Sequence, residues 1–415
     1  MQKQFLLENR LIVVISIALV LFCAVLLFGL YGRANPVIKI GILHSLSGTM
    51  VISEKPLVDA LQLAIEEANA GHGINGRLLE TVTVDCRSDW TYCAQQAERL
   101  ITDEKVSVLF GCWTSACRKA LKPVVEKHQH LLFYPVQYEG MEQSRNIIYT
   151  GAAPNQQIIP ATRWALDNLG KRVYLLGSDY VFPRMANIII KDMLKAAGGV
   201  LAGERYLPLG QHAMDAVVSD IVRQRPDVVL NTLNGGSNFA LFEALGKAGI
   251  GADKVPVLSF SIAEVELASM TTLETAGHYA AWNYFQSIPT AQNQAFVSSF
   301  HKRFGTQAVL DDPMEASYIG VKLWVQAARE AASAEPARVL GAIFRQTLNA
   351  PGGMVAIDPD NHHLWKTPRI GKIRGDGQFD IVWDAGQSMA PTPFPSYRLR
   401  DEWERLLQTA EGSRP

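Results

Sequence analysis

The stretch that decides the fold covers residues 110–140 and reads FGCWTSACRKALKPVVEKHQHLLFYPVQYEG. An apolar run ends at Gly111, a turn of small residues opens a helix that continues to His128, and a second apolar run begins at Leu131. This order predicts strand, turn, helix and strand. The turn then lies at the carboxyl end of a strand and the amino end of a helix, where free backbone N–H groups can hold a carbonyl or carboxylate oxygen.

Trp113 and Tyr134 would stand at neighbouring strand ends and form the aromatic walls of a small cleft. The alternative interpretation is a structural helix cap beside aromatic side chains of the core. Neutral and aromatic residues also follow later apolar runs, at 178–180, 234–235, 261–264 and 282–284. Because the carboxyl ends of strands face the ligand crevice in a doubly wound domain, these positions predict a pocket for a small, uncharged, polar molecule.

The remainder of the chain alternates strand and helix patterns, which predicts an α/β fold with parallel sheets and helices on both faces. The pattern begins at residue 38, restarts after Thr150, and past residue 36 the chain is long enough for two domains. After residue 279, three helical patterns and several short strands look like additions to the earlier layers. A chain that crosses repeatedly between two lobes has several linkers at one hinge, which suits closure around a ligand. The tail from Pro391 is expected to lie outside the core.

The N-terminus indicates export. Residues 11–30 form an uncharged apolar run long enough to cross a bilayer, which predicts a membrane anchor with residues 1–10 in the cytoplasm. A cleaved signal peptide is the alternative, since the small residues before Asn35 permit cleavage after Ala34. The bulky Phe22 before Cys23 argues against a lipoprotein. In either case the rest of the chain is exported, with the binding domain expected in the periplasm.

Charge and cysteine content narrow the partners. The net charge is −1, so the chain has no basic surface that would indicate nucleic acid as a partner. Four of the five cysteines lie between residues 86 and 117, and an exported domain can oxidise them. We expect a disulfide between Cys86, at a strand end, and Cys93, at a helix start. A zinc site is the alternative, but no CxxC motif and no nearby histidine support it.

Catalytic motifs are missing from the sequence. It has no GxxxxGK[ST], GxSxG or HExxH pattern, and its GxGxxG match at 71–76 does not follow an apolar strand run, as a dinucleotide-binding loop would. His362 and His363 are adjacent, which favours a surface pair over a chelate. The sequence therefore predicts a binding protein without a catalytic residue, metal or cofactor.

Nine segments resemble, in order, the urea and short-chain-amide branch of type I periplasmic binding proteins. They are GILHSLSGTMVISEKPLVDA, FGCWTSACRKALKPVVEKHQHLLFYPVQYEG, YTGAAPNQQIIPA, LLGSDYVFPRMANIIIK, NTLNGGSNFALF, SIAEVEL, GHYAAWNYFQS, DDPMEASYIGVKLW and NHHLWKTPRIGKIRGDGQFDIVW. The resemblance implies two Rossmann-like lobes, a three-stranded hinge and a ligand held between the lobes. The first lobe would comprise residues 37–150 and about 281–350, the second 151–280 and about 351–385, with 386–415 as a tail.

The resemblance also implies a ligand site. Ser115 would bind the ligand through its hydroxyl, together with the N–H groups of Ser115 and Ala116. Tyr134 would wall the first lobe and Tyr180 would close from the second. Glu264 matches an acid that binds the ligand ammonium in amino-acid-binding relatives, whereas Val136 replaces their hydroxyl residue and favours a neutral ligand. The further candidates are Trp113, Gln137, Tyr138, Asn234 and Asn283.

Three functions are compatible with these features. The first is a solute-binding protein that delivers urea or a short amide to an ABC permease. The second is a membrane-tethered sensor of a similar ligand that signals through a partner protein, and the third is an exported enzyme acting on amides. A binder of branched-chain amino acids is less favoured because of Val136.

Overall fold

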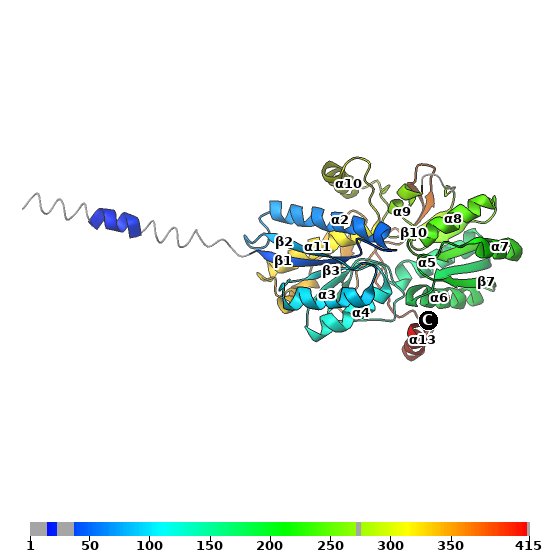
Figure 1. Cartoon of the computed structure of the whole chain (residues 1–415), viewed down its shortest axis with the longest axis horizontal. Helices are drawn as coiled ribbons and strands as arrows, with labels where there is room; N and C mark the ends of the chain where they lie inside the picture. Colours follow the sequence, from blue (N-terminus) through cyan, green and yellow to red (C-terminus); the bar gives the residue numbers. More distant parts are fainter. Residues whose placement is uncertain (1–14, 23–36, 271–274, 413–415) are drawn as a thin grey trace, which may run out of the picture.

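Two β-sheets, each covered by helices on both faces, organise the chain (Figure 1). The computed structural model describes residues 15–22, 37–270 and 275–412. We call the five-stranded sheet with its helices the first lobe and the seven-stranded sheet with its helices the second lobe. The prediction of an α/β fold with parallel sheets is confirmed.

The first lobe has a fully parallel sheet in the order β2-β1-β3-β4-β5. Apart from the edge strand β2, its strands are buried almost continuously, as is usual for a parallel sheet covered on both faces. They are β1 (Ile38–His44), β2 (Leu79–Asp85), β3 (Leu109–Gly111), β4 (Leu132–Tyr134) and β5 (Ile147–Tyr149). The helices are α2 (Val51–Ala70), α3 (Trp90–Thr102), α4 (Ser115–Lys127), α10 (Ala291–Phe304), α11 (Asp312–Glu330) and α12 (Pro336–Ile343).

The second lobe has the order β14-β13-β10-β9-β8-β6-β7, with parallel pairing from β10 to β7 and antiparallel pairing at β13 and β14. The strands are β6 (Arg172–Ser178), β7 (Val200–Leu207), β8 (Val228–Thr232), β9 (Val257–Ser259), β10 (Tyr279–Trp282), β13 (Arg369–Ile373) and β14 (Phe379–Asp384). The helices are α5 (Ile158–Asn168), α6 (Val181–Ala196), α7 (Asp215–Gln224), α8 (Ser237–Lys247), α9 (Glu264–Ser269) and α13 (Arg400–Gly412).

Each lobe has its own apolar core. One cluster joins the first sheet to α2, α3, α4 and the late helices α10, α11 and α12. Two clusters cover the opposite faces of the second sheet, one beneath α7 and α8 and the other beneath α5, α6 and α13. A small hairpin, β11 (Thr347–Ala350) with β12 (Gly353–Ala356), completes the described fold. α12 ends at Ile343, and β11 begins at Thr347.

The chain passes between the two lobes in three segments. These segments are residues 150–157, between β5 and α5; residues 283–290, between β10 and α10; and residues 357–368, between β12 and β13. They meet at one side of both sheets, so the carboxyl ends of the parallel strands of one lobe face the other lobe. This arrangement places the loops after β3, β4, β6 and β8 at the junction.

The expectation that the tail lies outside the core is wrong. α13 packs on α6, and the Trp403 side chain is fully buried with its indole N–H donating to Pro395 O at 2.7 Å. Arg398 pairs with Asp192 of α6 at 2.6 Å. The tail has many charged residues, but those in α13 lie on one face of an amphipathic helix. Its apolar face packs against the second lobe through Trp403, Leu406, Leu407 and Ala410.

Most of the expected membrane anchor lies outside the described residues. Within residues 11–30, only 15–22 are described, and they form a helix with exposed apolar side chains. Among the helices that the structure describes, none combines the length and the apolar character that a bilayer crossing needs.

Candidate functional site

The amino end of α4 lies at the junction, as the sequence predicts. Thr114 caps the helix, because its hydroxyl accepts from Cys117 N at 3.1 Å and its carbonyl accepts from Arg118 N at 3.0 Å. Among the described residues, no acceptor is bonded to the N–H of Ser115 or Ala116. Two backbone donors at a positive helix end are therefore available to an oxygen atom.

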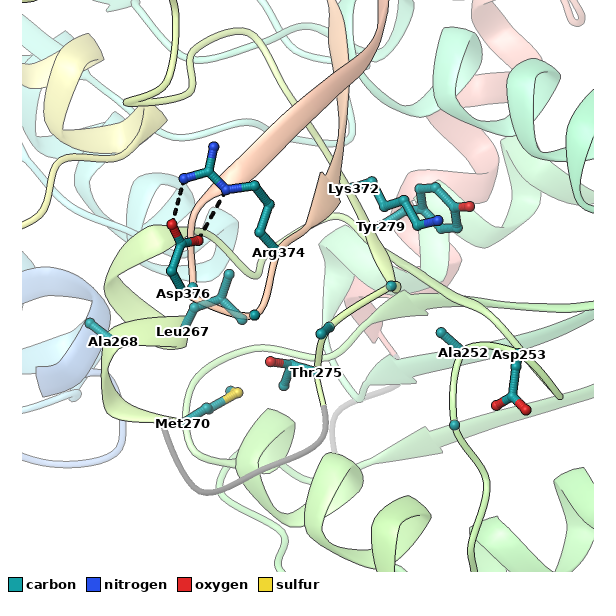
Figure 2. Close-up of a pocket in the computed structure, with 15 residues that line it drawn as sticks. Ala252, Asp253, Leu267, Ala268, Met270, Thr275, Tyr279, Lys372, Arg374 and Asp376 are labelled. Carbon is teal, nitrogen blue, oxygen red and sulfur yellow. Dashed lines mark hydrogen bonds and ion pairs between the residues drawn. The ribbon is translucent and has the colours of Figure 1, made fainter.

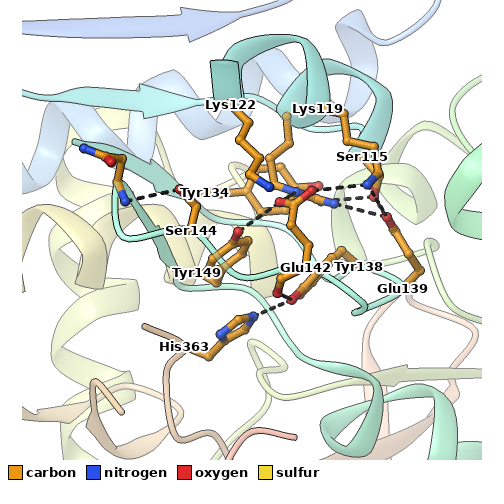
Figure 3. Close-up of polar contacts among 12 residues, drawn as sticks. Ser115, Lys119, Lys122, Tyr134, Tyr138, Glu139, Glu142, Ser144, Tyr149 and His363 are labelled. Atoms are coloured by element: carbon orange, nitrogen blue, oxygen red, sulfur yellow. Dashed lines mark hydrogen bonds and ion pairs between the residues drawn. The ribbon is translucent and has the colours of Figure 1, made fainter. Parts of the chain in front are cut away.

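The Ser115 hydroxyl is held by charged neighbours (Figure 3). It donates to Glu139 Oε2 at 2.5 Å and accepts from Arg118 Nη1 at 3.1 Å. Arg118 also donates to Glu139 Oε1 at 3.1 Å and to Glu142 Oε1 at 2.8 Å. The side chains of Arg118 and Glu139 are completely buried, and Glu142 is nearly so.

The charges of this network stabilise one another. Burial opposes the charged form of Arg118, but Glu142 and Glu139 outweigh it, so the guanidinium pKa lies well above its ordinary value. Burial raises the pKa of Glu142, but Arg118 and Lys119 outweigh it and hold the pKa far below its usual range. Arg118 and Glu142 are therefore both charged at neutral pH. The network holds the Ser115 side chain in place, because each buried charge has a partner.

Trp113 and Tyr134 lie on either side of the α4 turn. The Tyr134 hydroxyl donates to Trp113 O at 2.5 Å, and the Trp113 indole N–H donates to Asn234 Oδ1 in the second lobe at 3.3 Å. Tyr180, at the start of α6 in the second lobe, lies near Tyr134 and Glu139 of the first lobe. Burial, together with Tyr134 and Glu139, raises the Tyr180 pKa well above its ordinary value. Residues from both lobes thus meet over the amino end of α4.

Gln137 and Asn283 lie at the hinge instead. The Gln137 amide donates to Phe260 O at 2.7 Å, and the Asn283 amide donates to Gln156 O at 2.9 Å. Gln157 shares the Phe260 carbonyl at 3.1 Å. The Gln137 and Gln157 amides thus bond to the residue that follows β9 of the second sheet, and the Asn283 amide joins two of the linkers. The structure therefore places Asn283 at the start of the linker 283–290, and Gln137 in the loop after β4, bonded to the second lobe.

Tyr138 and Val136 are part of the first-lobe core. Tyr149 and His363 stack on each other with ring centroids 4.1 Å apart, Tyr138 packs against both rings, and the Tyr138 hydroxyl contacts His363 Nε2 at 2.5 Å. The Arg118 guanidinium lies 4.4 Å from the Tyr138 ring centroid. Val136 is buried against Gly151. The expectation that His363 is a surface residue is wrong, since its ring is fully buried in this stack.

Glu264 lies in a group of buried acids behind the hinge. One of its oxygens accepts from Gln286 N at 2.7 Å, and burial raises its pKa to about 8. Glu266 accepts from Ser53 Oγ of the first lobe at 2.7 Å, which links α9 to α2. Burial also raises the pKa of Asp311, further supported by Glu266. Bonded in this way, Glu264 is not among the side chains gathered at the Ser115 turn.

The four cysteines between residues 86 and 117 form two disulfides. Cys86 is bonded to Cys93, the pair that the sequence favours, and Cys112 is bonded to Cys117. The second bridge encloses the Trp113-Thr114-Ser115 turn. Because all four thiols are oxidised, they are not the thiolates that a zinc site requires. Among the described residues, no group of three or more histidine, cysteine or acidic side chains is arranged to hold a metal ion.

Sequence reasoning missed Arg118, Glu139 and Glu142. One signal could have identified Arg118: it follows Ser115 by three residues, so it lies on the same face of the helix as the buried Ser115 and Leu121. Glu139 and Glu142 come from an irregular loop, where no periodicity indicates the direction of a side chain.

An open pocket of about 800 Å³ lies elsewhere, in the second lobe (Figure 2). It is formed by the loops that precede β9 and β10 and by the turn between β13 and β14, where Arg374 pairs with Asp376. These loops are at the amino ends of the parallel strands. The pocket is therefore on the opposite edge of the sheet from the junction.

The structure has two lobes, each built on a β-sheet, with the linkers at one edge of both sheets and free backbone donors at the junction. This arrangement defines a two-lobed small-molecule-binding protein of the α/β class. The match to a family model specifies the family further. Residues 38–400 match the model described as a periplasmic binding protein domain. The chain belongs to this family, and it is of the type I class related to Leu/Ile/Val-binding proteins and to the solute-binding proteins of ABC transporters.

Similar proteins agree on the fold. Leu/Ile/Val-binding protein homolog 8 of Brucella abortus is 22% identical over 391 residues, which cover 86% of this chain and 93% of that protein. An ABC transporter solute-binding protein of Rhodopseudomonas palustris, solved with 3,4-dihydroxybenzoic acid, has a TM-score of 0.76 at 22% identity and covers 84% of this chain and 98% of its own. A leucine-binding protein of Thermotoga maritima has a TM-score of 0.73 at 20% identity, covering 84% and 98%.

One relative matches only in part. A limonene hydroxylase of Geobacillus stearothermophilus is 34% identical over 148 residues, which are 33% of this chain and 27% of that protein. The chain thus spans about a quarter of this relative's length. The match shows similarity over those 148 residues alone.

Proposed function

We propose that this protein captures urea or a short-chain amide between its lobes. The observation that carries the proposal is the pair of free N–H groups on Ser115 and Ala116, at the amino end of α4 and beneath Tyr134 and Tyr180. These donors hold the carbonyl oxygen, and the aromatic rings cover the small ligand from both lobes. A neutral ligand suits the site, because the charged side chains beneath it already neutralise each other.

The bound ligand is then delivered to an ABC permease. Support comes from membership of the periplasmic binding protein family and from the likeness to solute-binding proteins of ABC transporters. The binding domain resides in the periplasm, where an oxidising compartment allows both disulfides to form. Residues 11–30 keep it attached to the inner membrane.

A sensor is the second candidate, and the apolar N-terminal run favours it. A tether keeps the binding domain beside a membrane partner at high effective concentration, whether that partner is a permease or a signalling protein. Uptake of labelled urea by cells lacking the protein separates the two: loss of uptake indicates transport, and normal uptake with lost ligand-dependent signalling indicates sensing.

Calorimetric titration of the purified protein tests the ligand. The panel consists of urea, formamide, acetamide, leucine and 3,4-dihydroxybenzoate. We expect binding of urea or a short amide and none of the two carboxylates. Tight binding of leucine without any amide would contradict the proposal and would return Val136 and Glu264 to the amino-acid interpretation.

Membrane attachment has its own test. Cell fractionation followed by N-terminal sequencing should recover the chain in the membrane fraction with residues 11–30 intact. A soluble product that starts at Asn35 would show cleavage instead.

A further inference from the structure

The hydrogen bonds of the Ser115 hydroxyl determine what it can offer a ligand. A serine hydroxyl has one proton and two lone pairs. Its proton points to Glu139 Oε2 at 2.5 Å, and one lone pair receives the Arg118 Nη1 proton at 3.1 Å. The one hydrogen-bonding position left on Ser115 Oγ is its second lone pair. Ser115 Oγ is therefore a hydrogen-bond acceptor toward any bound molecule, while the backbone N–H groups of Ser115 and Ala116 are donors.

Glu139 fixes this polarity. Two cations face its other oxygen, since Arg118 donates to it at 3.1 Å and Lys119 lies 4.0 Å away, and Oε2 is left to accept the Ser115 proton. Its side chain is completely buried, so water does not compete for the Ser115 proton. Hydrogen bonds to a buried charged acceptor are among the strongest in proteins. The Ser115 proton is consequently held away from the ligand.

We propose that Glu139 determines which class of ligand the site binds. Because Glu139 accepts the Ser115 proton, the site offers two backbone N–H donors and one acceptor, Ser115 Oγ. It therefore binds a ligand that has a carbonyl oxygen and an N–H group side by side on one edge. Urea and primary amides present such an edge, with one N–H on the same side as the carbonyl oxygen. A carboxylate of the same shape presents a second oxygen, which would face the Ser115 lone pair and the Glu139 charge. Glu139 thus acts as a positioning residue that excludes carboxylates. This inference rests on the proposed function and deepens it.

Acetamide and acetate are the probes, since they differ only in replacement of NH₂ by O⁻. Titration of each with the full-length protein gives a ratio of dissociation constants. In wild type we expect acetamide to bind and acetate to bind at least about tenfold more weakly. In Glu139→Gln, the new amide can donate to Ser115 Oγ and release its proton toward the ligand, so the ratio should fall by roughly tenfold or more.

Glu142→Gln is the matched control. It removes an equal charge from the same guanidinium, 2.8 Å from Arg118 Nε, but Glu142 has no bond to Ser115. Its ratio should remain within about twofold of wild type. Thermal melting of both variants verifies folding.

Ser115→Ala gives a second reading if Glu139→Gln does not fold. It removes the acceptor and keeps the Arg118–Glu139 pair, so acetamide should weaken while acetate does not. Equal weakening of both probes would overturn the inference, as would an unchanged ratio in Glu139→Gln. In either case amide binding by wild type would leave the proposed function standing. Failure of wild type to bind acetamide or urea would instead refute the proposed function, and the inference with it.

Discussion

Glu264 shows what burial does to a single carboxyl group at the hinge. Its pKa is raised to about 8 by burial, and only one of its oxygens is bonded, to Gln286 N. Among the described residues, its other oxygen has no hydrogen-bond partner. Glu315, one helix away, has a pKa raised to about 7 by burial, despite Lys366 nearby. Both groups bind a proton in the folded protein at a pH where the unfolded chain has released it.

A carboxyl whose folded pKa is raised stabilises the fold fully below its unfolded value of 4.5, and this contribution is lost as pH rises through about 8. We therefore expect Glu264→Gln to match wild type near pH 4.5 and to melt at a higher temperature at pH 8.5, by an amount corresponding to a few kcal/mol at most.

Scanning calorimetry across this pH range measures the effect, and thermal melting avoids urea, which is a proposed ligand. Glu243→Gln is the control, since Glu243 is exposed and, within the described part of the chain, pairs only with Lys247 on the same helix. A stability difference for Glu264→Gln that is constant with pH would contradict the prediction.

At the scale of elements, the two disulfides have different positions relative to the ligand. The Cys86–Cys93 bridge joins the end of β2 to the start of α3, and no residue of the proposed site lies within it. The Cys112–Cys117 bridge spans the end of β3 and the first turn of α4, and it encloses Trp113 and Ser115. Both close short loops, for which the entropic gain is about 2 kcal/mol each.

We expect the double variants Cys86→Ala with Cys93→Ala and Cys112→Ala with Cys117→Ala to lose similar stability. Only the second should also weaken amide binding, by several-fold, because the turn that holds the ligand oxygen loses its constraint. Calorimetric titration and melting of the two variants make the comparison. An unchanged affinity in the second variant would show that Thr114 capping alone suffices to order the turn.

Elements whose pattern is local were predictable from the sequence. The helix from Ser115 to Lys127 and the cap at Asp311, which accepts from Met314 N, both follow from local rules. Contacts that depend on distant segments were not predictable. Tyr138 contacts His363, which is 225 residues later in the sequence, and Gln137 donates to Phe260 O, which is 123 residues later. Strand-end position identified residues near the junction, but it could not say which of them faced the turn and which faced the hinge.

At the scale of the whole molecule, the segment 390–412 joins both lobes. Pro393 O accepts from Met141 N of the first lobe at 2.8 Å. It lies beside Gly140, where a Cβ atom would be 2.2 Å from Pro393 O, so the missing side chain leaves room for this passage. Trp403 then anchors α13 to the second lobe, and Glu411 returns to Lys119 of α4 at 2.8 Å. We call this segment the C-terminal strap. In Figure 1 its helix lies below both sheets, beside α6.

Trp403 should control whether the strap stays in place. Trp403→Ala removes a fully buried indole, a change that commonly costs about 3–5 kcal/mol, and releasing the strap avoids most of that cost. We expect trypsin to cleave the variant at Arg398, Arg400 or Arg405 under conditions where wild type is protected. Trp365→Ala, at a half-exposed tryptophan outside the strap, should remain protected. Equal protection of both variants would show that other contacts hold the strap.

The strap has a practical consequence for optical sensing. Its helix is fixed to one lobe by Trp403, while Glu411, near its end, touches the other lobe through an exposed, replaceable contact. A dye attached at position 411 would therefore report the separation of the lobes from outside the ligand site. Paired with a second dye on the outer face of α4, it would turn the protein into a fluorescent biosensor for its ligand without a change to any residue that recognises it.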